Sequence, residues 1–188
     1  GYLAVDIQGG GTLNMSGSTV ENAGWHGIYA RDTSTTNYDN CTFQNNAGRA
    51  AYLVNGSCTN SLFDNNTHAL FLGYGTPAGP ITNCEFINHS SYAVWIYSDS
   101  ANLQSISDCR FQDNIIHIGA FSDVGDTLVI SDTTFQNGTG NTGLRFGAGA
   151  DTAAQPVTIQ DSIITGAGDT AIDADEKGGN NVNVTYST

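Results

Sequence analysis

The chain has 188 residues, and 39% of them are hydrophobic, which is enough for a continuous core in a single domain. Acidic residues outnumber basic ones by 18 to 5, so the formal net charge is −13. Such an acidic surface repels phosphate backbones and anionic lipids, which argues against binding to nucleic acid or to membrane surfaces. No apolar run reaches the roughly 20 residues that a bilayer span requires, so we expect no membrane insertion.

The first predicted strand covers 4–7. Its pattern, a small residue, an apolar residue, any residue and a second apolar residue, recurs at 27–30. Between these two strands, a strand that ends at Met15 and a strand around Val20 flank a corner at Gly17. One repeat unit therefore contains three short strands.

The same unit recurs along the rest of the chain. Its clearest marker is a short segment with a central apolar anchor, and the intervals between anchors run from 20 to 29 residues. The anchors are Val20, Phe43, Phe63, Phe86, Phe111, Phe135 and Ile164. Each unit therefore shares a fixed part and varies in one loop.

A residue type that tolerates a left-handed backbone stands three positions before every anchor. These residues are Gly17, Asn40, Asn60, Asn83, Asp108, Asp132 and Asp161. The alternation of inward residues also resets there, because Ile81 and Asn83 are two apart while Cys84 and Phe86 form the next inward pair. We therefore predict an all-β, right-handed, single-stranded parallel β-helix of about seven coils, with three sheets per coil and no evident capping helix.

The third strand of each coil carries an outward column that is unusually apolar. We predict these strands at 4–7, 27–30, 51–54, 69–72, 93–96, 143–146 and 171–174, and the register within 116–121 stays open. The predicted column reads Asp6, Tyr29, Leu53, Phe71, Trp95, Arg145 and Asp173. Outward positions of a solvated strand are normally polar, so four consecutive apolar or aromatic residues need an explanation.

Polar and aromatic residues are predicted on both sides of this column. His26, His68, Tyr92 and His117 flank it on one side, and Arg31, Asn55 and Tyr97 on the other. Aromatic rings with hydrogen-bonding neighbours suit sugar rings, which present apolar faces and hydroxyl groups. The predicted ligand-binding residues are Tyr29, Phe71, Trp95, His26, His68, Tyr92 and Tyr97. The alternative is that loops or a neighbouring domain cover the column.

The repeat resembles the pectate-lyase-like right-handed β-helix superfamily, including bacterial secreted and surface β-helix repeat proteins. The resemblance covers nearly the whole chain, and it implies an Asn-rich ladder at one corner, but its motifs specify the coil and no particular enzyme. Enzymes of this superfamily often act over the same sheet, as polysaccharide lyases, epimerases or hydrolases. Proton abstraction beside a uronate requires a base and cations, and we predict that the five basic residues, Arg31, Arg49, Arg110, Arg145 and Lys177, are scattered. A hydrolase requires clustered carboxylates, and we predict such a cluster only at the last coil, at Asp173, Asp175 and Glu176. His68 with Tyr92 is the nearest approach to a base and acid pair, and we predict no catalytic residues.

The cysteines and the acidic loops are the candidate disulfide and metal sites of the sequence. Cys41, Cys84 and Cys109 share one inward column and Cys58 lies in another, so we predict small buried residues and no zinc site. Cys84 and Cys109 lie on adjacent coils, but parallel stacked side chains fit a disulfide poorly. Calcium is the one metal that the acidic loops suggest, at Asp99, Asp123, Asp126 and Asp151. Their spacing matches no calcium motif, so we prefer a solvated acidic rim and predict no cofactor.

These features predict a non-catalytic extracellular or cell-surface module for adhesion that binds a polysaccharide or cell-surface glycan. A polysaccharide-active enzyme and a structural spacer in a large surface assembly remain alternatives. We expect residues 1–188 to form one domain of a longer protein or assembly. Open sheet edges would pair with other chains, so we also expect neighbouring domains or subunits to cap the coil.

Overall fold

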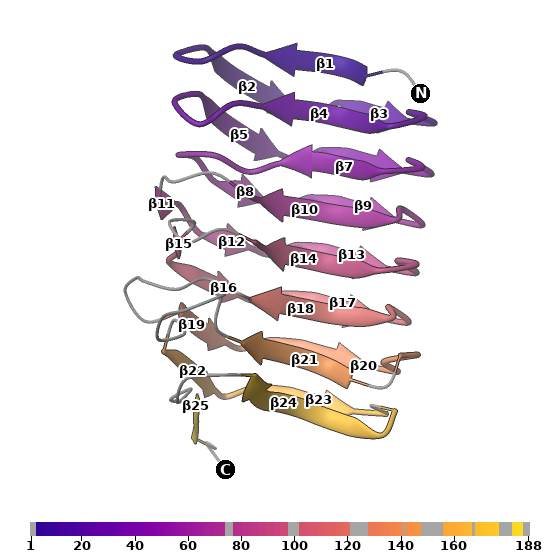
Figure 1. Ribbon diagram of the computed structural model, residues 1–188, viewed down its shortest axis with the longest axis vertical. Helices are drawn as coiled ribbons and strands as arrows, with labels where there is room; N and C mark the ends of the chain where they lie inside the picture. The colour runs from indigo at the N-terminus through magenta and orange to yellow at the C-terminus, as the bar shows by residue number, and fades with distance from the viewer. Residues whose placement is uncertain are drawn as a thin grey trace.

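The structure is a computed structural model that describes residues 3–73, 77–97, 102–120, 128–140, 142–147, 156–166, 168–176 and 182–185. It confirms the predicted right-handed parallel β-helix, with three parallel sheets that we call A, B and C. Strands from sheets B, C and A follow one another along the chain, and the coils stack along one axis (Figure 1). The described residues form strands and turns without a helix, and therefore without a helix that could span a membrane.

Sheet A carries the predicted outward column. Its eight parallel strands are β1 (Leu3–Ile7), β4 (His26–Ala30), β7 (Arg49–Tyr52), β10 (His68–Leu72), β14 (Tyr92–Ile96), β18 (Ile116–Ala120), β21 (Thr142–Gly147) and β24 (Thr170–Glu176). In β18, whose register the sequence leaves open, Gly119 pairs with Trp95 and thus occupies the column.

Sheet B forms the second wall of the coil. Its strands are β2 (Thr12–Ser16), β5 (Thr35–Asp39), β8 (Cys58–Thr59), β12 (Ile81–Thr82), β16 (Ser105–Ser107), β19 (Leu128–Ser131), β22 (Val157–Gln160) and β25 (Val182–Thr185). A small parallel pair, β11 (Pro77–Ala78) and β15 (Asn102–Leu103), lies in the stretches between sheets A and B.

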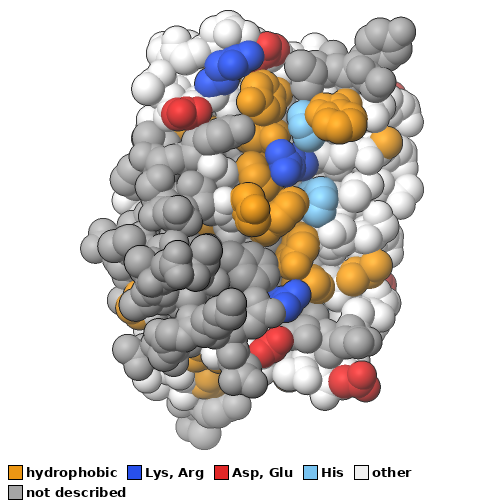
Figure 2. Space-filling view, viewed as in Figure 1, with side chains coloured by type: hydrophobic (Ala, Val, Ile, Leu, Met, Phe, Trp, Pro, Cys, Tyr) orange, Lys and Arg blue, Asp and Glu red, His pale blue; other side chains and the backbone are white. Residues whose placement is uncertain are grey.

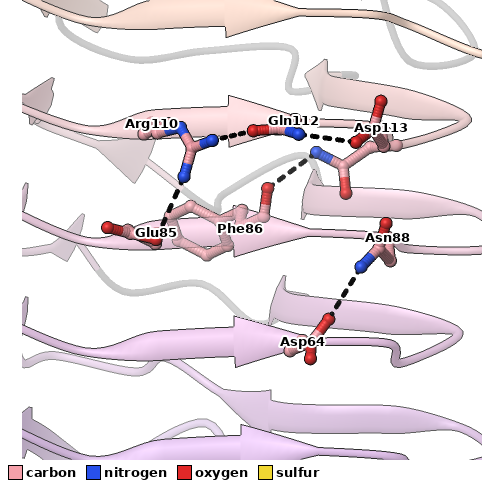
Figure 3. A network of polar contacts seen from close by, with 8 residues as sticks. Asp64, Glu85, Phe86, Asn88, Arg110, Gln112 and Asp113 are labelled. Carbon is pink, nitrogen blue, oxygen red and sulfur yellow. Dashed lines mark hydrogen bonds and ion pairs between the residues drawn. The ribbon is translucent and has the colours of Figure 1, made fainter.

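Sheet C forms the third wall, and its outward side chains are mostly polar. Its strands are β3 (Thr19–Glu21), β6 (Thr42–Gln44), β9 (Leu62–Asp64), β13 (Glu85–Ile87), β17 (Arg110–Gln112), β20 (Thr134–Gln136) and β23 (Ile163–Thr165). Its polar side chains contact one another between coils: Arg110 lies 3.4 Å from the Glu85 carboxylate, and Asn88 donates to Asp64 (Figure 3).

The corner between sheets B and C is built as predicted. All seven predicted corner residues have a positive φ, from 49° to 56°. The Asn side chains also bond between coils, since Asn83 Nδ2 donates to Asn60 Oδ1 at 2.8 Å. The left-handed backbone therefore turns the chain between the two sheets at the same place in every coil.

The core is a stack of identical side chains. The Phe rings of sheet C are fully buried and lie nearly parallel, with centroids 4.6 to 5.0 Å apart. They are Phe43, Phe63, Phe86, Phe111 and Phe135. Parallel strands about 4.8 Å apart place equivalent residues directly over one another, so equal residues pack in equal positions.

A buried polar ladder follows sheet C, at the corner where the chain turns toward sheet A. Each member accepts a hydrogen bond from the backbone N–H of the coil before it: Asn46 from Ala23, Asn66 from Asn46, His89 from Asn66 and Asn114 from His89. His89 replaces Asn in its coil and uses Nδ1 as the acceptor, at 3.1 Å. The ladder satisfies backbone groups that would otherwise be buried without a partner.

Candidate functional site

The outward column of sheet A contains four consecutive aromatic residues, Tyr29, Tyr52, Phe71 and Trp95, which we call the aromatic column. Successive ring centroids are 4.8, 4.9 and 5.1 Å apart. The prediction that Leu53 occupies the column was wrong. Strand β7 ends at Tyr52, and Leu53 turns into the core, where it is buried.

A second column on the same sheet runs beside the first. Its members are His26, Arg49, His68 and Tyr92, which the strand register places side by side, and we call it the flanking column. The prediction that His117 belongs to it was wrong, because Ile116 pairs with Tyr92 and takes that position. His117 alternates to the inside, where it is buried against Phe111 and Phe135.

The centre of the aromatic column is covered by the protein itself. Tyr52 is 1% exposed and Phe71 3%, and together with Ala30 and Val54 they form a small hydrophobic cluster outside the sheet. The backbone at Gly73 lies against Phe71, because a Cβ there would come within 2.0 Å of the ring. Cover by the protein, the alternative left open by the sequence, thus applies to the middle of the column, while its two ends stay partly accessible.

Arg49 lies in the flanking column, whereas the sequence predicted it to be one of several scattered cations. Its guanidinium carbon lies 3.6 Å from the centroid of the Phe71 ring and 5.3 Å from that of Trp95, and it donates a hydrogen bond to the Tyr52 hydroxyl. Among the described residues, the three ion pairs join Arg31 with Asp6, Arg110 with Glu85 and Arg145 with Asp173, so none involves Arg49. The positive charge of Arg49 is therefore stabilised by aromatic rings and by a hydroxyl group.

Two strongly exposed aromatic residues extend the accessible ends. Trp25 is 60% exposed and its ring meets that of His26 at 5.4 Å, while Tyr97 is 58% exposed and lies 5.1 Å from Trp95. Trp25 was missed by the sequence analysis because it precedes β4 and belongs to no repeated column. Figure 2 shows the resulting hydrophobic patch with His and basic side chains beside it on the sheet A side of the molecule. We call the two columns with Trp25 and Tyr97 the aromatic face.

The other predicted neighbours have different surroundings. Arg31 lies 5.6 Å from the Tyr29 ring centroid and 3.8 Å from the Asp6 carboxylate. Asn55 is exposed and donates to the Ser34 carbonyl at 3.2 Å. The seven residues that the sequence predicts for ligand binding, in contrast, lie on one face of the structure. They are Tyr29, Phe71, Trp95, His26, His68, Tyr92 and Tyr97.

The two histidines of the flanking column are neutral near pH 7. Burial, followed by the nearby Arg49 charge, lowers the pKa of His26 and that of His68 to about 4. Among the described residues, His68 Nδ1 and Trp95 Nε1 are buried without a hydrogen-bond partner. Neutral imidazoles both donate and accept hydrogen bonds, so the face combines apolar rings with polar atoms of both kinds.

The arrangement of titratable groups on and around this face bears on catalysis and metal binding. His68 and Tyr92 meet as stacked rings with centroids 6.0 Å apart. Within the described part of the chain, no group of three or more His, Cys, Asp or Glu residues is placed to hold a metal ion. The proposed calcium residues Asp99, Asp123, Asp126 and Asp151, and the basic residue Lys177, lie outside the described residues.

A protein-family model described as a right-handed beta helix region matches residues 1–105, which include every member of the aromatic face. Neither a curated protein nor a solved structure matches the chain significantly. The matched residues make up more than half of the 188, and their strands form the coil that the family description names. The chain therefore belongs to the right-handed β-helix family.

Proposed function

We propose that the protein is a non-catalytic module that binds a polysaccharide or cell-surface glycan on its aromatic face. The observation that carries this proposal is the pair of exposed rings, Trp25 and Tyr97, at the two accessible ends of an otherwise packed aromatic column. Exposed aromatic side chains that neighbour polar groups on a rigid wall suit sugar rings, whose faces are apolar and whose edges carry hydroxyl groups.

The buried middle of the column supports this role by holding Tyr29, Trp95 and Tyr97 in place. Phe71 contacts both Trp95 and Tyr97, with ring centroids 5.1 and 6.4 Å apart, and Tyr52 contacts Tyr29 at 4.8 Å. Rings held by neighbours lose little freedom when a ligand binds, so little of the binding free energy is spent on ordering them. The neutral His26 and His68 supply hydrogen bonds without attracting counter-ions.

The rod-like coil also fits a place outside the cell, where such a module would serve in adhesion. Stacked coils form a stiff structure with an elongated face, and the strongly acidic surface keeps the protein soluble. Adhesion, the extracellular or cell-surface location and the neighbouring capping domains are parts of this same proposal.

A glycan array tests the proposal, with the wild-type protein and the variants Tyr97→Ala and Trp25→Ala. We expect binding to one class of glycan that falls at least tenfold in either variant. Ile163→Ala is the matched control, since Ile163 is as exposed as Tyr97 but lies on sheet C. Equal binding by all four proteins would contradict the assigned face, and an array without any binding would favour the structural spacer.

A polysaccharide lyase is the second candidate, and one observation favours it. Arg49 lies between the neutral His26 and His68, and proton abstraction beside a uronate needs a neutral base and a cation near the carboxylate. The assay is the release of unsaturated products from an acidic polysaccharide. If the wild-type protein released such products and both His68→Ala and Arg49→Gln did not, the protein would be a lyase and not a non-catalytic binding module.

A further inference from the structure

The cysteines lie close together where sheets B and C meet. All four are buried and carry free thiols. Cys58 Sγ lies 3.8 Å from Cys84 Sγ, and the two residues are 26 positions apart on adjacent coils. Cys109, which stacks with Cys84 in one column, is the other neighbour of Cys84 on an adjacent coil.

The relation between Cys58 and Cys84 differs from that of a stacked pair. Cys58 belongs to β8 in sheet B and pairs with Ile81, whereas Cys84 follows the corner at Asn83 and precedes β13 in sheet C. Their side chains thus enter the core from two different walls and meet at the sulfur atoms. Stacked Cys84 and Cys109 project from the same wall, and Cys109 Sγ accepts from the Cys84 amide at 3.5 Å and donates to the Ser107 carbonyl at 3.1 Å. A disulfide requires Cβ vectors that converge, which favours Cys58 with Cys84.

Of the two residues, Cys84 lies at a groove in the protein surface, although only 1% of the residue is exposed. A shallow open groove runs along the corner between sheets B and C, and its lining includes Asn60, Asn83, Cys84, Asp108, Cys109 and Arg110. Cys58 is not among the described residues that line this groove, and both cysteines belong to the buried core. A small oxidant that enters at this groove therefore meets Cys84 or Cys109 before Cys58, and the Cys58 sulfur lies 3.8 Å from that of Cys84.

We propose that Cys58 and Cys84 form an oxidation site that a peroxide converts into a disulfide between adjacent coils. The Cys84 sulfur attacks one peroxide oxygen, the O–O bond breaks, and Cys84 sulfenic acid and one water form. The Cys58 sulfur then attacks the Cys84 sulfur, the S–O bond breaks, and a second water leaves. Two thiols lose two electrons and two protons, and hydrogen peroxide is reduced to two waters.

The cross-link would join the two coils that carry Phe71 and Trp95. The coil that begins at β8 ends at β10, and the coil that begins at β12 ends at β14. The bond would close a loop of 26 positions and thereby restrict the unfolded chain. Oxidation therefore stabilises this part of the coil without a change at the aromatic face.

The folded protein is treated with hydrogen peroxide, denatured, and analysed with a chromogenic thiol reagent and by peptide mapping. We expect two of the four thiols to disappear, one linked peptide pair to contain Cys58 and Cys84, and the thermal unfolding midpoint to rise. A linked pair that contains Cys109, or four thiols retained in the folded protein, would overturn the proposal.

Variants separate the pair from the other cysteines. Cys41→Ser and Cys109→Ser should still lose two thiols, whereas Cys58→Ala should form no cross-link and should instead label at Cys84 with a sulfenic acid reagent. Cys84→Ser is a second test that preserves the fold, since Ser18 and Ser61 occupy the same position in other coils. A cross-link that persists in either Cys58→Ala or Cys84→Ser would contradict the assigned pair.

Discussion

The inner phenylalanine stack and the outer aromatic column use the same coil spacing in different ways. Inside, successive rings of Phe43 to Phe135 are nearly parallel, with interplanar angles from 5° to 23°. Outside, successive rings of Tyr29 to Trp95 cross at 60° to 80°. The inner stack repeats one residue in one environment, whereas the outer column uses three residue types. Core packing thus accounts for the inner rings, while the exposed rings beside the outer column, Trp25 and Tyr97, need a further reason, for which we propose ligand binding.

The largest expected effect tests the inner side of this comparison. Phe86 is fully buried between Phe63 and Phe111, so Phe86→Ala would remove ring contacts on both sides and leave a cavity. We expect the free energy of unfolding to fall by about 3–5 kcal/mol in chemical denaturation. A loss below about 1 kcal/mol would mean that the stack is not the main source of stability.

The next effect concerns acid and the buried ladder. Burial lowers the pKa of His89 to about 3, so the folded protein keeps it neutral while the unfolded chain binds a proton below pH 6.5. The stabilising contribution is complete above pH 6.5 and is lost as pH falls toward 3, by about 1.4 kcal/mol per pH unit. Unfolding measured between pH 6 and 4.5 should therefore depend less on pH in His89→Asn, which restores the ladder residue of Asn46 and Asn66. Equal slopes in the two proteins would argue against a neutral His89.

A smaller effect tests the corner. Asn83 has a φ of 53°, a conformation that costs an ordinary L-residue about 1–2 kcal/mol. Asn83→Ala should lower the free energy of unfolding by that amount relative to Asn83→Gly, measured by denaturation. Both variants lose the side-chain bond to Asn60, so their difference reports the backbone alone. Equal stabilities would show that the corner does not depend on this conformation.

The smallest effect tests the outer side. Tyr97 is 58% exposed, so Tyr97→Ser should change the free energy of unfolding by less than about 0.5 kcal/mol. The measurement is again chemical denaturation, with Phe86→Ala as the comparison. A loss of about 2 kcal/mol or more would place Tyr97 among the packing residues and weaken its proposed role in binding.

The corners could be predicted because only Asn, Asp and Gly accept their backbone conformation readily, and the chain repeats these residues at a fixed distance before each anchor. The register of β7 could not be predicted, because Ala51, Tyr52, Leu53 and Val54 are all apolar. Their pattern does not show which of them point into the core. All four are buried, two of them outside the sheet.

Parts of the candidate site depend on neighbours that the sequence does not reveal. Arg49 begins β7, and its place over Phe71 follows from pairing with coils 23 and 19 residues away, at His26 and His68. The predicted position of His117 was wrong by one residue, because its strand carries apolar residues on both faces. Trp25 stands before its strand, where no repeated pattern constrains it. The sequence thus predicts repeated positions well and single positions poorly.

The purely parallel pairing has a consequence for how the chain folds. Every strand of the three large sheets bonds only to strands of the preceding and following coils, so each contact spans about one coil of sequence. Nucleation needs two adjacent coils, after which further coils add one at a time, as in a zipper. A defect inside the rod would then pause this propagation at one coil and leave the coils already formed intact.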